Sequence, residues 1–161
     1  MSMAVYAGTF DPVTYGHLDV LHRAAKIFDT VIIAVAPNTG KNPMFTVEER
    51  MDMIREACAG DKNILVETLD GLLVDYAKAR GATVLIRGLR VISDFEYEFQ
   101  MTQMNRELQP SLETLFFMPS QKYAFTSSTI VKQVARYDTD RIANHVPPCV
   151  AAALKKRFSL R

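Results

Sequence analysis

The sequence predicts an α/β domain with a five-stranded parallel sheet and helices on both faces of that sheet. Five short runs rich in β-branched and aliphatic residues alternate with helical patterns, which is typical of a parallel sheet with crossover helices. The runs are almost continuously apolar, as expected for strands that helices cover on both sides. In chain order they comprise residues 4–6, 31–36, 64–67, 84–86 and 115–118.

Length and composition narrow the classes of protein to consider. The 161 residues are about the length of one ordinary domain, so we expect a single domain over residues 1–161. The net charge of +1, from 19 basic and 18 acidic residues, gives no reason to expect nucleic acid or an anionic membrane as a partner. No apolar run approaches the ~20 residues of a membrane span, and no secretion signal is recognisable at the N-terminus. We therefore expect a cytoplasmic protein in which Cys58 and Cys149 are free thiols.

Helix starts can be recognised between the apolar runs. Thr46 with Glu49, and Ser93 with Glu96, have the spacing at which a hydroxyl and a carboxylate each accept a backbone N–H of the other residue. Both pairs predict the N-terminal cap of a helix. A last helix is expected over residues 150–158, where basic residues suit its C-terminus.

The helix that follows Ser93 is apolar on two faces. One stripe consists of Ile92, Phe95 and Phe99, and another, roughly half a turn away, consists of Tyr97, Met101, Met104 and Leu108. The sheet of the same chain can cover one stripe. A neighbouring subunit is our hypothesis for the other, the alternative being a monomer that packs this helix deeply.

In an open parallel sheet, ligands bind beyond the carboxyl ends of the strands, so the residues after each run are site candidates. After the first run, residues 8–17 read Gly-Thr-Phe-Asp-Pro-Val-Thr-Tyr-Gly-His. Glycine allows close backbone approach there, and His17 is predicted to open a helix that reaches about residue 28. The N–H groups and dipole of a helix start suit phosphate. After the second run, a loop over residues 37–41 ends in the cation Lys41.

Two later runs end in the same kind of chemistry. The fourth is followed by Arg87 and Arg90, and guanidinium groups bind phosphate oxygens in a bidentate way. After the fifth, residues 126–129 read Thr-Ser-Ser-Thr and offer hydroxyl and N–H groups where a new helix is expected. Four strand ends thus carry anion-binding groups, which indicates a ligand with several phosphates.

Each of these groups also has a structural interpretation. Lys41 can be a solvated loop residue, while His17 and residues 126–129 can cap helices. The two arginines can form ion pairs with the acidic residues that follow them, namely Asp94, Glu96 and Glu98. Convergence of all four groups at one sheet edge favours a shared site over four separate structural roles.

Other polar residues and motifs are less informative. Asp11 either orients its loop, which we favour, or helps to hold Mg²⁺. His22 and His145 lie outside the strand ends and are interpreted as packing or surface residues. The chain has neither a P-loop motif nor a Gly-x-Gly-x-x-Gly after its first run, which argues against a P-loop enzyme and a dinucleotide-binding dehydrogenase.

Taken together, the motifs resemble nucleotidyltransferases with a His/Thr-x-Gly-His motif, and more closely the bacterial phosphopantetheine adenylyltransferases. The matching segments are residues 8–12, 14–17, 41–46, 84–90, 94–98 and 117–120. Thr14 at the first position of the motif, the Arg-Gly-Leu-Arg sequence and the Asp-Phe-Glu-Tyr-Glu sequence separate this family from nicotinate-nucleotide adenylyltransferases and glycerol-phosphate cytidylyltransferases. Departures from the family are Ala7, Tyr123 and Lys132.

The resemblance implies a doubly wound, Rossmann-like nucleotidyltransferase fold and transfer of the adenylyl group of ATP to 4′-phosphopantetheine, with Mg²⁺. The products are dephospho-coenzyme A and pyrophosphate, in coenzyme A biosynthesis. It also implies a homohexamer built as a dimer of trimers, and coenzyme A as an inhibitor. For the acceptor it assigns Thr9, Lys41, Leu73 and Arg87. For ATP it assigns Thr9, Phe10, His17, Gly88, Leu89, Arg90, Glu98, Tyr123, Ala124, Phe125, Thr126, Ser127, Ser128 and Thr129.

A direct reaction fits these residues. The acceptor phosphate is already anionic, so it can attack the α-phosphorus of ATP in line with the departing pyrophosphate, without a general base or a covalent intermediate. We expect His17, Lys41 and Arg90 to act in catalysis, while the ligands of Mg²⁺ stay open. The rival interpretations are a nucleotidyltransferase with another acceptor, a regulatory module that only binds ATP, and a fragment of a class I aminoacyl-tRNA synthetase.

Overall fold

The computed structural model describes residues 2–37, 42–90 and 92–159. For residues 92–94 within the last range, it describes the backbone alone. Within this part of the chain, five parallel strands form one sheet in the order β3-β2-β1-β4-β5. The strands are β1 (Met3–Gly8), β2 (Thr30–Val35), β3 (Ile64–Thr68), β4 (Val84–Gly88) and β5 (Glu113–Phe117). The predicted five-stranded parallel sheet is therefore confirmed, and each predicted run overlaps one strand.

The strand order makes the sheet doubly wound. The chain proceeds from β1 outward to β3, then returns to place β4 on the other side of β1. The order thus reverses between β1 and β4. In this topology a crevice opens beyond the carboxyl ends of the two strands at the reversal. The most probable ligand position in such a sheet is therefore next to β1 and β4.

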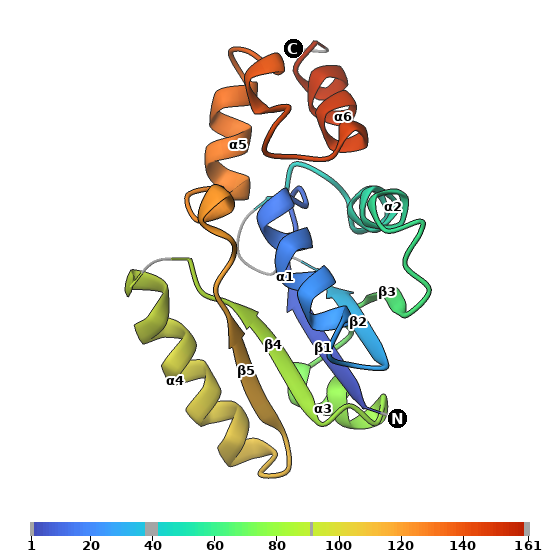
Figure 1. The fold of residues 1–161 in the computed structure, drawn as a ribbon, viewed down its shortest axis with the longest axis vertical. Helices are drawn as coiled ribbons and strands as arrows, with labels where there is room; N and C mark the ends of the chain where they lie inside the picture. The colour runs from blue at the N-terminus through green and yellow to red at the C-terminus, as the bar shows by residue number, and fades with distance from the viewer. Residues whose placement is uncertain (1, 38–41, 91, 160–161) are drawn as a thin grey trace.

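Helices cover both faces of the sheet (Figure 1). They are α1 (Tyr15–Ala25), α2 (Val47–Ala57), α3 (Leu73–Ala79), α4 (Ile92–Leu108), α5 (Ser128–Ala135) and α6 (Pro148–Ser159), with short 3-10 turns at Gln121–Tyr123 and Asp140–Ile142. The helix α4 lies beside β5, whereas α5 and α6 lie beyond the ends to which the strand arrows point (Figure 1). Those two helices therefore flank the edge where a ligand is expected.

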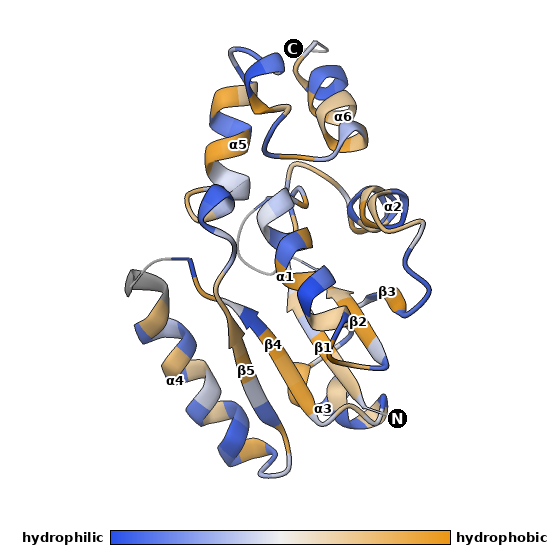
Figure 2. Cartoon of the chain, in the orientation of Figure 1, coloured by the Kyte–Doolittle hydropathy of each residue, from blue (hydrophilic) through white to orange (hydrophobic). Residues whose placement is uncertain are grey.

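Alternate side chains of the central strands enter two separate cores. Tyr6 and Ile33 belong to the larger core, which includes residues of α1, α2, α5 and α6. Val5 and Ile32 belong to the smaller core with Val74 of α3. The strands are accordingly coloured as predominantly apolar in Figure 2. Burial on both faces is the physical reason for their continuous hydrophobic sequences.

The helix starts confirm one predicted cap and correct two boundaries. The Thr46 hydroxyl accepts the Glu49 N–H and the Glu49 carboxylate accepts the Thr46 N–H, which forms the expected capping box. The helix α1 begins at Tyr15, not at His17, because Thr14 caps it, and it ends at Ala25, before the expected residue 28. The helix α4 begins at Ile92, so its start precedes Ser93, the residue predicted to cap it.

The helix α4 turns polar residues inward and apolar residues outward. Thr102 is partly buried and Asn105 is buried. Members of both predicted apolar stripes are exposed, namely Phe95, Tyr97, Phe99, Met101, Met104 and Leu108. The expectation that the sheet of the same chain covers one stripe is therefore wrong for the described side chains. The cause is the position of α4 beside the edge strand β5, which leaves most of its circumference outside the fold.

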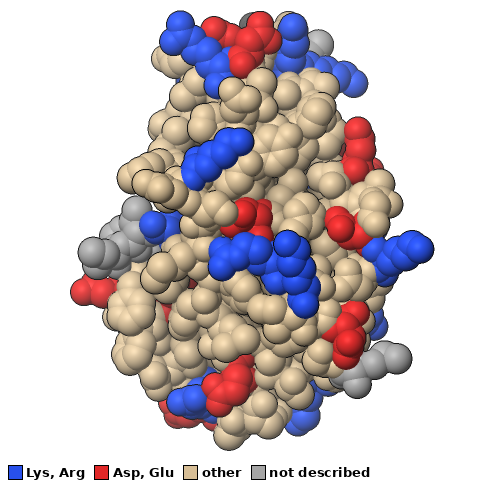
Figure 3. All heavy atoms as spheres, in the orientation of Figure 1, with Lys and Arg blue, Asp and Glu red and all other residues tan. Residues whose placement is uncertain are grey.

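The face of the molecule shown in Figure 3 carries no dominant charge. Basic and acidic groups are interspersed on the face shown in Figure 3, in keeping with the net charge of +1. Among the described helices, none combines the length and the apolar character that crossing a membrane requires.

Candidate active site

A cavity of about 930 Å³ opens where β1 and β4 end. Its walls come from β1 and the turn after it, α1, β4, α4 and the start of α5. Eleven of the predicted site residues line it, namely Thr9, Phe10, His17, Arg87, Gly88, Arg90, Glu98, Thr126, Ser127, Ser128 and Thr129. Three of the four predicted strand ends therefore converge in one space, as the strand order requires.

The remaining predicted residues lie elsewhere. Lys41 falls outside the described residues. Leu73 begins α3 and packs against the smaller core. Leu89, Ala124 and Phe125 do not line this cavity, and Tyr123 lines a different one. Their assignment to ATP or to the acceptor stays a prediction.

The turn after β1 depends on a close contact between Gly8 and Phe10. Phe10 has a φ of 47°, which side-chain-bearing residues seldom adopt. A Cβ on Gly8 would lie 2.9 Å from the ring of Phe10, so only glycine fits there. The buried Phe10 ring also meets the edges of Tyr6 and His17, with centroids 5.2 and 5.1 Å away. This packing places the His17 imidazole at the cavity.

His17 is the third residue of a capping box at the start of α1. Its backbone N–H donates to the Thr14 hydroxyl over 3.4 Å, and its Nδ1 accepts the Thr14 backbone N–H over 3.1 Å. A backbone N–H can only donate, so the neutral ring carries its proton on Nε2. Burial, followed by the charge of Arg90, lowers the pKa of His17 to about 4. His17 is therefore a neutral Nε2–H donor at physiological pH.

The first N–H groups of α1 are less open than the sequence indicated. Tyr15 donates to the His145 carbonyl over 2.9 Å, and Leu18 donates to the Thr14 carbonyl over 3.0 Å. With the His17 N–H also bonded to Thr14, Gly16 supplies the remaining N–H of the first turn among the described residues. The expected row of free N–H groups is thus reduced by the capping box and by His145.

The structure gives Asp11 structural partners in two other segments of the chain. Its buried carboxylate accepts the backbone N–H groups of Met44 and Phe45, each over 3.0 Å, and pairs with Lys132 Nζ at 2.6 Å. These bonds hold the segment before α2 and the side of α5 against the β1 turn. Both carboxylate oxygens are therefore occupied within the protein.

Arg87 forms an ion pair with Glu98, one of the alternatives that the sequence left open. The Nε atom of Arg87 lies 2.6 Å from Glu98 Oε2, and its Nη1 donates to the Ala7 carbonyl over 3.0 Å. Burial opposes the charge of Arg87, but the hydrogen bonds that it donates to Glu98, together with the negative charge of Glu98, outweigh burial and raise its pKa. Both side chains line the cavity. The pair connects β4 to α4 and presents a fixed guanidinium at the site.

At the start of α5, Ser127 forms a helix cap, which is the structural alternative that the sequence left open, and some hydroxyls have partners in the protein. Ser127 accepts the Ile130 N–H over 3.2 Å, and Ser128 Oγ donates to the Pro12 carbonyl over 2.8 Å. The Thr126 hydroxyl lies 3.0 Å from Nδ1 of His145, a partly buried residue outside the nucleotide cavity, in agreement with the packing role predicted for it. Through this contact and its carbonyl, His145 links the α5 start to the α1 start.

Sequence reasoning missed Arg50, a buried residue that connects the segments next to the cavity by hydrogen bonds. It is 1% exposed and donates to the Phe45, Thr46, Thr9 and Ala36 carbonyls over 2.6–3.2 Å. Arg50 thereby fixes the chain after β1 and after β2. A signal was present, because Arg50 shares a helix stripe with Met53, Ile54 and Ala57, where an apolar residue is expected.

Lys132 was named only as a departure from a family pattern, yet it lines the cavity beside Asp11. It lies four residues after Ser128 on α5, so both side chains occupy one helix face. This spacing is the signal that could have identified it.

Comparisons with known proteins agree with this geometry. A family model described as cytidylyltransferase-like matches residues 5–134. A putative nicotinate-nucleotide adenylyltransferase from Vibrio parahaemolyticus is similar in structure, with a TM-score of 0.68, 16% identity, and coverage of 98% of this chain and 95% of that chain. A nicotinic acid mononucleotide adenylyltransferase of Plasmodium falciparum, complexed with APC, has a TM-score of 0.70, 15% identity, and coverage of 99% and 96%. The same Plasmodium protein complexed with NaAD matches at 16% identity with the same TM-score.

Proposed function

Because this chain belongs to the cytidylyltransferase-like family and has a Rossmann-like nucleotidyltransferase fold, we propose that it transfers the adenylyl group of ATP to 4′-phosphopantetheine. The products are dephospho-coenzyme A and pyrophosphate. Family membership supports nucleotidyl transfer in general. The adenylyl group as the transferred unit is supported by the names of the similar structures, which are adenylyltransferases. The acceptor is supported by the sequence motifs around Thr14, Arg87 and Glu98.

The observation that carries the proposal is the pairing of charges in the cavity. His17, Arg87 and Arg90 supply a neutral donor and two cations. Among the described cavity residues, the two carboxylates are Asp11 and Glu98, and both are held by cations or N–H groups. Neither is placed to remove a proton from a hydroxyl acceptor. An acceptor that is already an anion, such as a phosphate monoester, needs no such base.

The chemistry that follows is a single displacement. An oxygen of the acceptor phosphate forms a bond to the α-phosphorus of ATP while the bond from that phosphorus to the bridging oxygen breaks, and pyrophosphate leaves with the electron pair. No proton moves in this step. Its barrier therefore falls through positioning and through donors that meet the charge of the five-coordinate phosphorus.

In this scheme His17 Nε2–H donates to an oxygen of the α-phosphate, supported by the Gly16 N–H at the start of α1. Arg90, with Ser128 or Thr129, stabilises the departing pyrophosphate. Lys132, fixed by Asp11, adds a cation to the same wall. Thr9 and Arg87 hold the acceptor phosphate, and Lys41 offsets the repulsion between the two anionic substrates.

Mg²⁺ fits this site as a companion of ATP. The cavity carboxylates are occupied, so the described residues offer oxygen ligands mainly as hydroxyls and carbonyls. Mg²⁺ is commonly held by substrate phosphates and water with few protein ligands. Bound in this way, it would neutralise phosphate charge during transfer.

The alternative acceptor is nicotinate mononucleotide, which is also a phosphate monoester. The similar structures favour it, since they are adenylyltransferases for that mononucleotide. A pyrophosphate-release assay with ATP should include 4′-phosphopantetheine, nicotinate mononucleotide and glycerol 3-phosphate as parallel acceptors. We expect turnover with 4′-phosphopantetheine and detection of dephospho-coenzyme A by mass spectrometry. Turnover only with nicotinate mononucleotide would reject 4′-phosphopantetheine as the acceptor. It would leave the proposed adenylyl transfer unchanged.

The outer face of α4 is proposed to be covered by other copies of the chain in a homohexamer. Five large apolar side chains of α4 that do not line the nucleotide cavity are exposed, namely Phe95, Phe99, Met101, Met104 and Leu108, and the edge strand β5 also exposes Leu115. An apolar face of this kind on a surface helix marks an interaction site. Sedimentation velocity at dilute protein concentration tests this, and a single monomeric species would reject it.

A further inference from the structure

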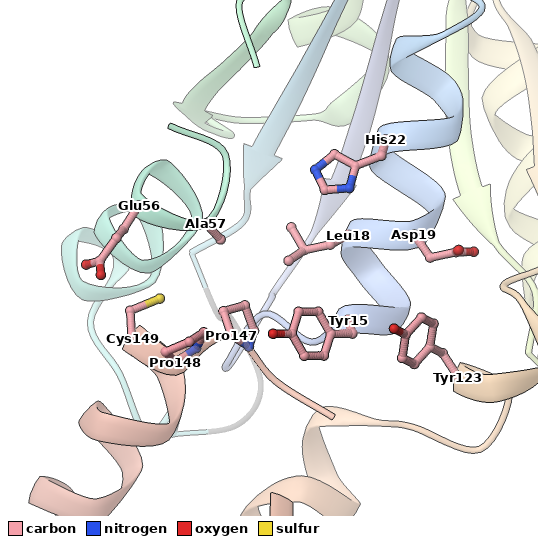
Figure 4. Close-up of a pocket in the computed structure, with 10 residues that line it drawn as sticks. All are labelled: Tyr15, Leu18, Asp19, His22, Glu56, Ala57, Tyr123, Pro147, Pro148 and Cys149. Carbon is pink, nitrogen blue, oxygen red and sulfur yellow. The ribbon is translucent and has the colours of Figure 1, made fainter. Parts of the chain in front are cut away.

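A second cavity, of about 490 Å³, lies between α1, α2 and the start of α6. Figure 4 shows the imidazole of His22 extending from α1 toward the α2 side of this cavity. Ala57, the last residue of α2, also lines this cavity. The chain then continues through Cys58, which caps α2, to Asp61. The ligand atoms of His22, Cys58 and Asp61 all lie within 4.8 Å of one another.

Local structure brings these three groups together. The Asp61 N–H donates to the Cys58 carbonyl over 2.9 Å, so a tight turn places the two residues side by side. The helix α1 supplies His22, whose Nε2 lies 3.1 Å from Asp61 Oδ2. The three groups thus come from two segments of the chain, because Cys58 lies 36 positions after His22, and the segments meet only in the fold. Cys58 is buried, whereas the other two side chains are partly exposed.

The spacing of the three atoms is compatible with a zinc centre after small side-chain movements. Zinc binds nitrogen and oxygen at about 2.0–2.2 Å and sulfur at about 2.3 Å, so the edges of its tetrahedron measure roughly 3.3–3.6 Å. The separation of 3.1 Å between His22 and Asp61 is close to such an edge. The limit of 4.8 Å for the whole set leaves only small movements of the side chains to close around an ion.

We propose that His22, Cys58 and Asp61 form a binding site for Zn²⁺, separate from the nucleotide cavity. An imidazole, a thiolate and a carboxylate are all established zinc ligands, and three of them leave one position for water. The charges balance, because Zn²⁺ meets one thiolate and one carboxylate, and the Cys58 thiol releases its proton to solvent on binding. The partly exposed His22 lines the adjoining cavity, which gives the ion and a water molecule access.

Binding at this site would join the C-terminal half of α1 to the end of α2. The same helix α1 carries His17 at its start, but His22 lies outside the nucleotide cavity. Zn²⁺ would therefore stabilise the fold without taking part in the transfer reaction. The inference does not depend on the identity of the acceptor.

The test uses the full-length protein after chelator treatment, titrated with Co²⁺ and with Zn²⁺. We expect one equivalent of Co²⁺ to give the absorption of a tetrahedral site with a thiolate-to-metal charge-transfer band, and Zn²⁺ to displace it. Cys58→Ser should abolish that band and weaken Zn²⁺ binding by about 10²-fold or more, while His22→Asn should weaken it as well.

Cys149→Ser is the matched control, because this second thiol lines the cavity next to His22 and donates to the Met53 carbonyl, but it is not one of the three clustered ligands. It should keep both the band and the affinity. Circular dichroism in chelator checks that each variant is folded. Absence of saturable binding, unchanged binding by Cys58→Ser, or loss of the band in Cys149→Ser would each overturn the proposal. In the first case, His22 and Asp61 form only a hydrogen bond.

Discussion

The nucleotide cavity has two walls that are held in different ways. The α1–α5 wall consists of Asp11, Thr14, His17, Ser128 and Lys132, and its groups are tied to one another or to backbone from other segments. The β4–α4 wall consists of Arg87, Arg90, Tyr97 and Glu98, and the ion pair between Arg87 and Glu98 connects its strand to its helix. The first wall is organised by the core of the chain. The second depends on how α4 is held, and the outer face of α4 is apolar and exposed.

This difference has a functional consequence under the proposed reaction. Groups that must meet a developing charge work best when their positions are fixed before the substrate arrives. The α1–α5 wall meets that requirement within one chain. The acceptor side would reach its final geometry only when α4 is covered. A variant of His17 in the first wall should therefore affect kcat, and a variant of Arg87 in the second should affect the KM of the acceptor.

The largest effect is expected from His17→Ala. Loss of the Nε2–H donor should lower kcat by roughly 10²-fold or more, because this bond strengthens in the transition state. Steady-state kinetics with both substrates measures it, and the KM for ATP should change much less. Turnover near the wild-type level would show that His17 takes no part in catalysis. It would also contradict our expectation that the α1–α5 wall determines kcat.

A smaller effect is expected from Arg87→Ala. Loss of a charge-assisted contact should raise the KM of the acceptor by about 10–100-fold, with a minor change in kcat. Glu98→Gln is the matched variant. It keeps the shape of the side chain at position 98 and removes the charge that pairs with Arg87, while the Arg87 guanidinium itself is still present. An effect of Arg87→Ala on ATP alone would reverse our division of the two substrates.

The role of assembly is tested by Met104→Glu on the exposed face of α4. Because Met104 is 51% exposed, the change should alter the stability of a single chain by less than about 0.5 kcal/mol. It should shift the sedimentation profile toward smaller species and raise the KM of the acceptor by about threefold, leaving the KM for ATP unchanged. Gln103→Glu, also exposed on α4 but outside the apolar stripes, is the control. If the two variants have the same sedimentation profile and the same acceptor KM, the geometry of the β4–α4 wall does not depend on assembly through α4.

The smallest effect concerns pH. The folded pKa of His17 is about 4, below the ordinary value of 6.5, so the ring stays neutral as pH falls from 8 to 5. Titration of His17 should therefore change kcat by less than about twofold in that range. An NMR titration of labelled histidine locates the transition of the ring, and a kcat inflection near 6.5 that disappears in His17→Gln would contradict this.

The same shift affects stability in one direction. Between pH 6.5 and 4 the unfolded chain binds a proton at His17 that the folded chain does not, so the free energy of unfolding falls as pH falls. This loss of stability is absent well above pH 6.5 and is complete below about pH 4. Denaturant unfolding of the wild type and of His17→Gln at several pH values should show a smaller pH dependence in the variant.

Much of the fold and part of the site could be predicted from local patterns. The apolar runs identified all five strands because burial on both faces leaves a continuous hydrophobic signature. The Thr46 cap was recognisable because its partner Glu49 is three residues away. Thr14 and His17 were recognisable as a motif for the same reason. Their arrangement as a capping box shows that a signature of function can also be a local structural device.

Other features were decided only by the tertiary structure. The partners of Asp11 lie 33 to 121 residues away, and Arg87 meets the Ala7 carbonyl across 80 residues. No sequence window contains both members of such a pair, so the sequence could present these residues only as open alternatives. The burial of Arg50 and the outward apolar face of α4 were hidden for the same reason. Sequence by itself thus determined which groups reach the carboxyl edge of the sheet, because strand patterns are local. Tertiary packing decided which of those groups are occupied by the protein and which remain for a ligand, because hydrogen bonds and ion pairs form between segments that only the fold brings together.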